Sequence, residues 1–193
     1  MKLLAPLALL CLAAMLAAGC GSTPPTRYYE LQATARGYGP SRPLTIVVEP
    51  VTIPPDVDRP QIVLGGPGDE VAIEDFHRWA APLQDALALV VSRNLAALVG
   101  AEDVALSGEL AGPPKYRVRI SIRSFGSRLG DAAAVDARWS VRRDDGLLRS
   151  GHATIRVPVK AAGFDALASA HSAAAERLSA DIADAILALE LRS

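Results

Sequence analysis

Polar and apolar residues alternate along three segments in the second half of the chain. In residues 116–123, 135–142 and 152–159, nearly every second position is apolar and the positions between are mostly charged or polar. This period of two predicts half-buried β-strands. The turn signal Asp144-Asp145-Gly146 predicts antiparallel pairing of the last two. We therefore expect a three-stranded meander with one face on the core and one face in water.

The first half of the chain has shorter and less regular strand patterns. Residues 44–53 are almost continuously β-branched or apolar, which is typical of a strand buried on both faces. Residues 61–64 and 70–76 flank the glycine-rich stretch 65–69, and this arrangement predicts a hairpin. Residues 28–31 and 104–107 are expected to form short strands.

Apolar residues at helical spacing predict two helices, at about 80–99 and at 164–190. Pro82 is tolerated in a first turn, and Gly100 ends the first helix. His171 falls on the apolar stripe of the second helix, so we interpret it as a core or edge histidine. Two helices on one apolar face of a mixed, largely antiparallel sheet predict an α/β two-layer sandwich.

The N-terminus has the pattern of a bacterial lipoprotein signal. An uncharged apolar run follows Lys2, and small residues lead up to Cys20. We interpret residues 1–19 as the signal peptide, cleaved after Gly19, and 20–27 as the lipidated cysteine and a tether reaching roughly 20 Å. Residues 28–193 then form a single domain. The alternatives are an ordinary secretory signal or an uncleaved anchor.

The predicted processing determines what cysteine chemistry is available. Cys11 lies in the removed segment, so Cys20, carrying a diacylglyceryl group and an N-acyl chain, is the one cysteine of the mature chain. An intrachain disulfide or a cysteine nucleophile is thereby excluded. Gly21 after the cysteine, where aspartate would favour the inner membrane, favours the outer membrane.

Charge and motif searches predict neither nucleic-acid binding nor an enzyme. The chain has 20 Lys and Arg against 21 Asp and Glu, so no basic excess favours nucleic acid. The loop 65–69 lacks the lysine of a phosphate-binding loop, and we interpret it as a turn. Glu70, Glu74, Asp75 and His77 lack zinc-binding spacing, and no Gly-x-Ser-x-Gly elbow occurs. The sequence predicts no catalytic residues, metal or cofactor.

Six arginines are expected to share the polar face of the meander, opposed mainly by Asp136. We leave three interpretations open: a solvated sheet face, an acidic protein partner, or anionic lipid headgroups. These arginines are Arg117, Arg119, Arg123, Arg138, Arg142 and Arg156.

Three short motifs give the chain a resemblance to a known family. Tyr28-Tyr29-x-Leu31 follows the tether, and two further motifs lie at 58–61 and 78–83. Together they resemble the ABC-type transport auxiliary lipoproteins, also described as PqiC-like, over nearly the whole mature chain. The motif residues outside the first segment are Asp58, Arg59, Pro60, Gln61, Arg78, Trp79, Pro82 and Leu83.

The resemblance implies a fold similar to the N-terminal domain of TolB-like periplasmic proteins. It also implies a non-enzymatic lipoprotein at the periplasmic face of the outer membrane, serving a lipid-transport or membrane-integrity system. The partner would be a tunnel-forming protein with MCE (mammalian cell entry) domains, and a homo-oligomeric ring is left open. The alternatives are a lipid carrier with its own apolar cavity and an envelope hydrolase.

For the motif residues two roles remain open, scaffold and docking surface. As scaffold, Trp79 would wedge between helix and sheet, and Arg59 and Arg78 would pair with carboxylates such as Asp58 or Asp75. As a docking surface, Asp58, Arg59 and the tip of loop 65–69 would share one edge.

Overall fold

The three alternating segments form the predicted meander. In the computed structural model, which describes residues 24–37, 41–110 and 112–191, these strands are β6 (Tyr116–Ser127), β7 (Ala132–Arg143) and β8 (Leu148–Pro158). They pair antiparallel in chain order. Their apolar positions are mostly buried and their polar positions mostly exposed, as the alternation requires.

Two parallel strands complete a five-stranded sheet. β2 (Arg42–Val48) lies between β6 and β5 (Ala101–Leu106), which gives the order β5-β2-β6-β7-β8. This central position explains the burial of Ile46, Val47 and Val48. The predicted strand 44–53 ends early, at Val48. Pro50, two residues further on, has no N–H for a ladder, and Thr52 beyond it forms an isolated bridge with Ser121.

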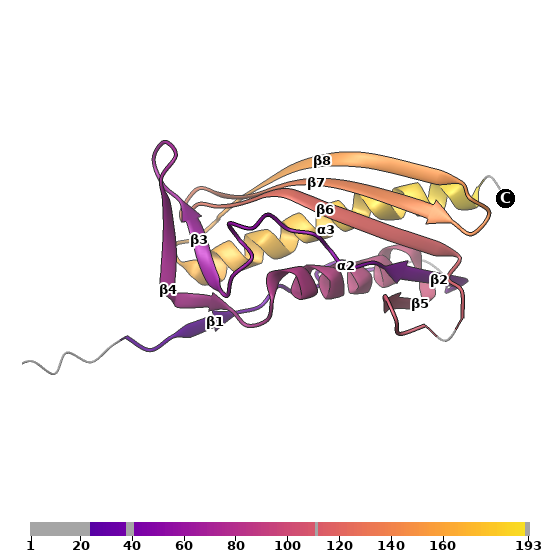
Figure 1. Cartoon of the computed structure of the whole chain (residues 1–193), viewed down its shortest axis with the longest axis horizontal. Coiled ribbons are helices and arrows are strands. Elements are labelled where there is room, and N and C mark those ends of the chain that lie inside the picture. The colour runs from indigo at the N-terminus through magenta and orange to yellow at the C-terminus, as the bar shows by residue number, and fades with distance from the viewer. Residues whose placement is uncertain (1–23, 38–40, 111, 192–193) are drawn as a thin grey trace, which may run out of the picture.

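A second, three-stranded sheet stands at one end of the first (Figure 1). The predicted hairpin supplies β3 (Gln61–Gly65) and β4 (Val71–Trp79), and β1 (Arg27–Tyr29) adds in parallel to the end of β4. Gln61 lies opposite Arg78, but the next residue of β3 lies opposite Glu74. This bulge bends β4 and reverses which of its side chains face inward.

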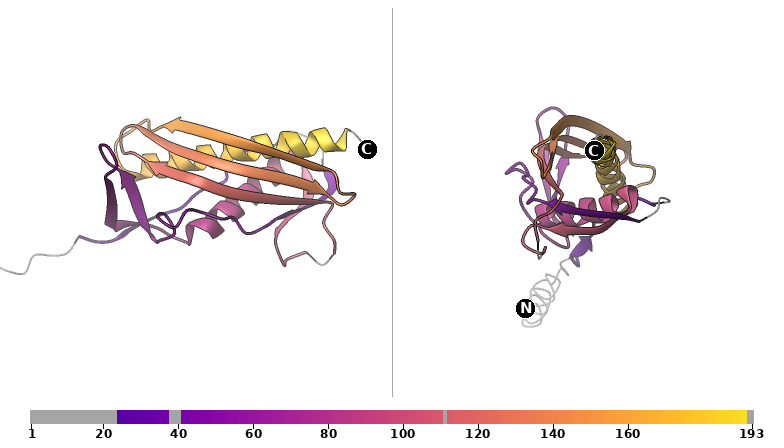
Figure 2. Two further views of the ribbon diagram at one scale, coloured as in Figure 1. Left: turned by 45° about the horizontal axis from the view of Figure 1, so that its top comes forward. Right: turned by 90° about the vertical axis from the view of Figure 1, so that its right-hand side faces the viewer.

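Both helices pack on one face of the five-stranded sheet. α3 (Phe164–Glu190) contacts β7 and β8, and α2 (Leu83–Val99) contacts β2 and β5. Figure 2 shows the sheet curving around α3, with α2 alongside. The bounds of α3 are as predicted, but α2 begins later than residue 80 because Pro82 is its N-cap. The fold is an α/β two-layer arrangement, as expected.

The two ends of the long axis carry different structures. We call the end with β1 and the three-stranded sheet the tether end, and the end where α3 finishes the far end (Figure 1). At the far end the buried guanidinium of Arg143 donates to the carbonyl of Leu189 (2.6 Å) and to Asp145 (2.6 Å). These bonds fasten the end of α3 to β7. No described helix is long and apolar enough to cross a membrane.

Candidate docking surfaces

The three motifs converge at the tether end. Tyr28 lies opposite Arg78 and Tyr29 opposite Trp79 in the parallel pair β1–β4. Gln61 lies opposite Arg78 from the other side. Residues from three distant segments therefore form one row across the small sheet. We call this group the motif cluster: Tyr28, Tyr29, Leu31, Asp58, Arg59, Pro60, Gln61, Arg78, Trp79, Pro82 and Leu83.

Backbone hydrogen bonds hold the motif cluster together. The N–H of Trp79 donates to the carbonyl of Pro60 (2.7 Å), and the N–H of Ala80 donates to the carbonyl of Tyr29 (2.9 Å). These bonds join each motif to the segment leading into α2. Part of the motif cluster is thus scaffold.

The inward side of the motif cluster packs on the core through Trp79, which is 6% exposed. Its ring meets Phe125 of β6 edge-on, with centroids 6.1 Å apart, and His171 of α3 in the same way at 6.0 Å. The predicted position of Trp79 between helix and sheet is confirmed. Because it touches both layers, it ties the small sheet to the main core.

His171 is a buried core residue, as interpreted from its position on the apolar stripe. It has no exposed surface, stacks on Phe125 with centroids 4.0 Å apart, and shares a hydrogen bond of 2.8 Å between its Nε2 and the Ser127 hydroxyl. Burial lowers the pKa of His171 to about 3, so the ring is neutral near pH 7. Ser127 is also buried. A substrate has no access to this Ser–His contact, and we assign it a structural role.

The other predicted acid–base candidates do not form a site together. His77 turns inward, where its Nδ1 meets the Tyr29 hydroxyl at 2.7 Å and its ring stacks on Phe164 at 3.7 Å between centroids. Glu70 and Asp75 are exposed and Glu74 is half-buried. Within the described part of the chain, no three His, Cys, Asp or Glu residues are grouped to hold a metal ion.

The outward side of the motif cluster is hollowed. A pocket of about 510 Å³, which we call the motif pocket, opens there. Its wall is formed by Tyr28, Asp58, Arg59, Pro60, Arg78, Trp79, Ala80, Ala81, Pro82 and Leu83.

The two arginines of the motif pocket do not pair as predicted. The Nε of Arg78 donates to the backbone carbonyl of Asp75 (3.0 Å) and not to its carboxylate. The Nε of Arg59 is buried and has no hydrogen-bond partner within the described part of the chain. Among the described residues, neither arginine forms an ion pair. The expected pairing with Asp58 or Asp75 is wrong.

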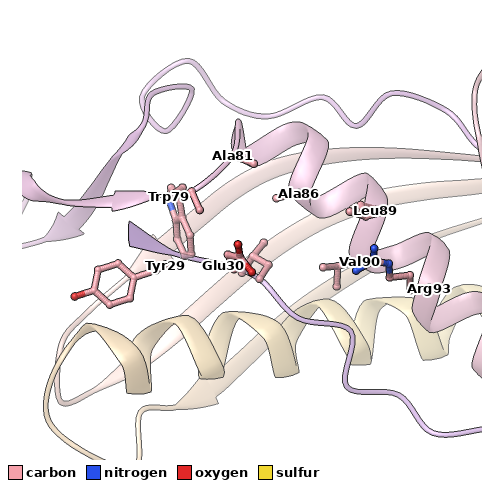
Figure 3. A pocket seen from close by; sticks show the side chains of 10 residues that line it. Tyr29, Glu30, Trp79, Ala81, Ala86, Leu89, Val90 and Arg93 are labelled. Carbon is pink, nitrogen blue, oxygen red and sulfur yellow. The ribbon is translucent and has the colours of Figure 1, made fainter. Parts of the chain in front are cut away.

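A second pocket adjoins the motif pocket along Trp79, Ala80 and Ala81. It measures about 310 Å³ and lies between the segment after β1 and the outer side of α2 (Figure 3). Figure 3 shows Glu30 near its middle and Arg93 at one end. The sequence did not single out these two residues, since Glu30 is the variable position of the first motif and Arg93 lies outside the motifs.

The hairpin loop lies away from the motif pocket. Gly65, Gly66 and Pro67 line a separate pocket of about 470 Å³ with Arg128 and Leu129 of the β6–β7 turn. Asp58 and Arg59 precede the start of β3, whereas this loop follows its end, so they lie at opposite ends of this edge strand. Whether they act together as one docking edge stays a prediction.

The six predicted arginines share the outward face of the meander, as expected. Three of them pair with three different carboxylates, whereas we expected Asp136 to be the main partner. Arg119 meets Glu49 at 2.8 Å, Arg123 meets Asp136 at 3.7 Å, and Arg156 meets Asp131 at 2.5 Å.

The other three, Arg117, Arg138 and Arg142, form no ion pair with any described carboxylate. Arg117 and Arg142 lie directly opposite each other on β6 and β7. Like charges in this position destabilise a sheet. We call these three residues the free arginines. They extend from the middle of the meander to the far end, whereas Arg123 and Arg156 lie nearer the tether end.

The fold and these surfaces define an α/β domain with two helices on one sheet face and exposed arginines on the other. A family model for the ABC-type transport auxiliary lipoprotein component matches residues 29–183. The chain belongs to this family, which confirms the resemblance seen in its motifs. No curated protein matches the chain.

Two solved structures share the fold over nearly their whole length. A crystal structure of an uncharacterized protein is 20% identical, with a TM-score of 0.71, over 84% of this chain and 99% of that chain. A Xanthomonas campestris protein of the family DUF330 is 18% identical, with a TM-score of 0.72, over 86% of this chain and 98% of that chain. At these identities the likeness concerns the fold.

Proposed function

We propose that this chain is the lipoprotein subunit that docks an MCE-domain tunnel protein to the outer membrane. Membership in the family of ABC-type transport auxiliary lipoproteins supports a non-enzymatic role beside a transporter. Cys20, the proposed lipid-attachment residue, lies outside the described residues. It precedes β1 by seven positions, a span of roughly 25 Å at most. The lipid anchor therefore attaches the domain to the membrane by its tether end.

The observation that carries the docking role is the group of free arginines. Their charge is not neutralised within the described structure, and Arg117 and Arg142 repel each other across the strand pair. Exposed arginines on a rigid sheet suit bidentate pairing with carboxylates of a partner. β7 is 12 residues long, which separates its two ends by roughly 40 Å. A surface at the far end suits a protein partner better than the membrane at the tether end.

The interior favours docking over a lipid-carrier role. Side chains with at most 2% exposure fill the space between sheet and helices. They come from both layers and include Ile46, Leu87, Leu95, Leu178, Ile182 and Ile186. The pockets described above lie at the surface, outside this interior.

Capture of the partner tests the docking surface. Lipidated protein with Arg117, Arg138 and Arg142 all changed to Gln should recover at least tenfold less MCE-domain protein from its native host in mild detergent. The control is Arg119→Gln with Arg156→Gln, which removes charge from the same face at paired positions. Equal capture by both variants and the unmodified chain would remove this surface as the interface.

A ring of copies and a direct link to the outer membrane belong to the same proposal. The ring requires self-association of the purified lipidated chain, measured by its mass in detergent. Outer-membrane sorting is expected from Gly21.

A further inference from the structure

The motif pocket contains two guanidiniums whose charge no described carboxylate neutralises. Arg59 and Arg78 are both half-buried in its wall, and neither forms an ion pair with a described carboxylate. A buried donor without a partner costs about 1–3 kcal/mol. The Nε of Arg59 is such a donor. An anion in the pocket would offset part of the cost of keeping this guanidinium half-buried.

The start of α2 adds to the positive potential of the motif pocket. Pro82 and Leu83, at the first turn of this helix, form part of the wall. Pro82 is the N-cap, and no side chain caps the helix. The helix dipole and the uncapped amides of the first turn favour an anion there. Asp85 in the first turn offsets part of the dipole, but it does not line the pocket.

The wall also contains one carboxylate, Asp58, and the exposed phenol of Tyr28. Asp58 is exposed and forms no ion pair with a described residue. Pro60, Trp79, Ala80 and Ala81 supply apolar surface between the charged groups. A ligand for this pocket therefore needs an anion for the two guanidiniums and, beside it, a cation for Asp58.

The position of the motif pocket indicates where such a ligand comes from. Tyr28 belongs to the wall and follows Cys20 by eight residues, a chain length of roughly 28 Å at full extension. With the proposed lipid on Cys20, the pocket lies within reach of the leaflet that holds the anchor. The phosphate of a phospholipid headgroup is an anion present there at high density.

We propose that the motif pocket binds the phosphoethanolamine headgroup of a membrane phospholipid. The phosphate lies between Arg59 and Arg78 at the start of α2, and the ammonium group faces Asp58. The proposal rests on the proposed anchoring at Cys20. Binding holds the tether end against the leaflet and directs the far end, with its free arginines, away from the membrane.

Titration of the headgroup tests the pocket directly. The lipidated full chain in maltoside micelles is titrated with glycerophosphoethanolamine, and the indole N–H of Trp79 is followed by NMR, with that of Trp139 as an internal reference. We expect a saturable shift at Trp79. Arg59→Gln should weaken binding at least tenfold. It should not impair folding, since the Nε of Arg59 has no hydrogen-bond partner and its guanidinium no ion pair among the described residues. Arg119→Gln, an exposed arginine outside both the motif pocket and the free arginines, is the control and should bind as the unmodified chain does.

Two further arms identify the chemistry. Asp58→Asn should weaken binding of glycerophosphoethanolamine several-fold and leave that of glycerol phosphate unchanged. Inorganic phosphate should bind the unmodified chain more weakly than the headgroup does. No shift at Trp79, an unchanged affinity in Arg59→Gln, or equal binding of inorganic phosphate would overturn the proposal. Arg59→Gln should still capture the MCE-domain protein, so a failure here is distinct from a failure of the docking role.

Discussion

Arginine has different surroundings at the two ends of this domain. At the far end, Arg143 is buried and fastens α3 to β7 through short hydrogen bonds, while Arg117 and Arg142 lie close by on the outer face with no ion pair to a described carboxylate. At the tether end, Arg59 and Arg78 line a pocket and form no ion pair either. The contrast separates arginines that hold the fold from arginines available to something outside it.

The same separation exists within the motif cluster. Its inner side, with Trp79 against Phe125 and His171, belongs to the core. Its outer side, with Tyr28 at 63% exposure, contributes little burial. A motif can therefore combine scaffold and interface, and its two sides respond differently to substitution.

The largest expected effect is on the inner side. Trp79→Ala should lower the free energy of unfolding by about 3–5 kcal/mol, because it leaves a cavity between β6 and α3. Tyr28→Ala, one strand away and exposed, should change it by less than about 0.5 kcal/mol. Urea unfolding followed by circular dichroism measures both. Equal effects would remove the distinction between the two sides.

A smaller effect concerns the pH dependence of the core. The pKa of His171 is lowered by burial from its ordinary value of 6.5 to about 3. Between about pH 3 and pH 6.5, the unfolded chain therefore binds a proton on this ring that the folded chain does not bind. Stability from this residue is complete above pH 6.5 and falls as the pH drops towards 3. At pH 5 the loss should be about 2 kcal/mol.

His171→Gln is the matched variant for this pH effect. Glutamine can keep a hydrogen bond to Ser127 but does not titrate. Its free energy of unfolding should be lower at pH 7, since the ring stacking with Phe125 is lost. The free energy of unfolding of the variant should also change less between pH 7 and pH 5 than that of the unmodified chain. An unaltered pH slope would show that other groups control the acid sensitivity.

The smallest expected change is a gain in stability. Arg117→Gln removes the repulsion from Arg142 and should raise the free energy of unfolding by about 0.2–1 kcal/mol. Arg156→Gln, which loses the contact with Asp131, should show no gain. If Arg117→Gln destabilises the protein, the free arginines have a structural role and their availability for a partner is in doubt.

Local patterns explain which elements could be predicted from the sequence. β6, β7 and β8 each have an alternating pattern of their own, and α3 has its own apolar stripe. The meander and this helix could therefore be predicted from the sequence. The pairing of β1 with β4 could not, because three residues carry no period and their partner lies about fifty positions away. The bulge in β4 could not be predicted from the sequence either. It changes the register of the strand, so that His77 faces inward.

The candidate site was predictable only in part, for a related reason. The motif residues and the six arginines could be named, since alternation assigns a face to each strand residue. For two of the three paired arginines, the carboxylate comes from outside the meander strands. Glu49 follows β2 and Asp131 lies in a turn, and no periodicity places either of them.

The location of the MCE-domain protein tests the central claim most directly. Membranes from the native host are fractionated, and the share of this partner that sediments with the outer membrane is measured in cells producing the unmodified chain or Cys20→Ser. We predict that most of this share is lost with Cys20→Ser, although the variant still captures the partner in detergent. An unchanged share in the outer-membrane fraction would contradict docking through this lipoprotein.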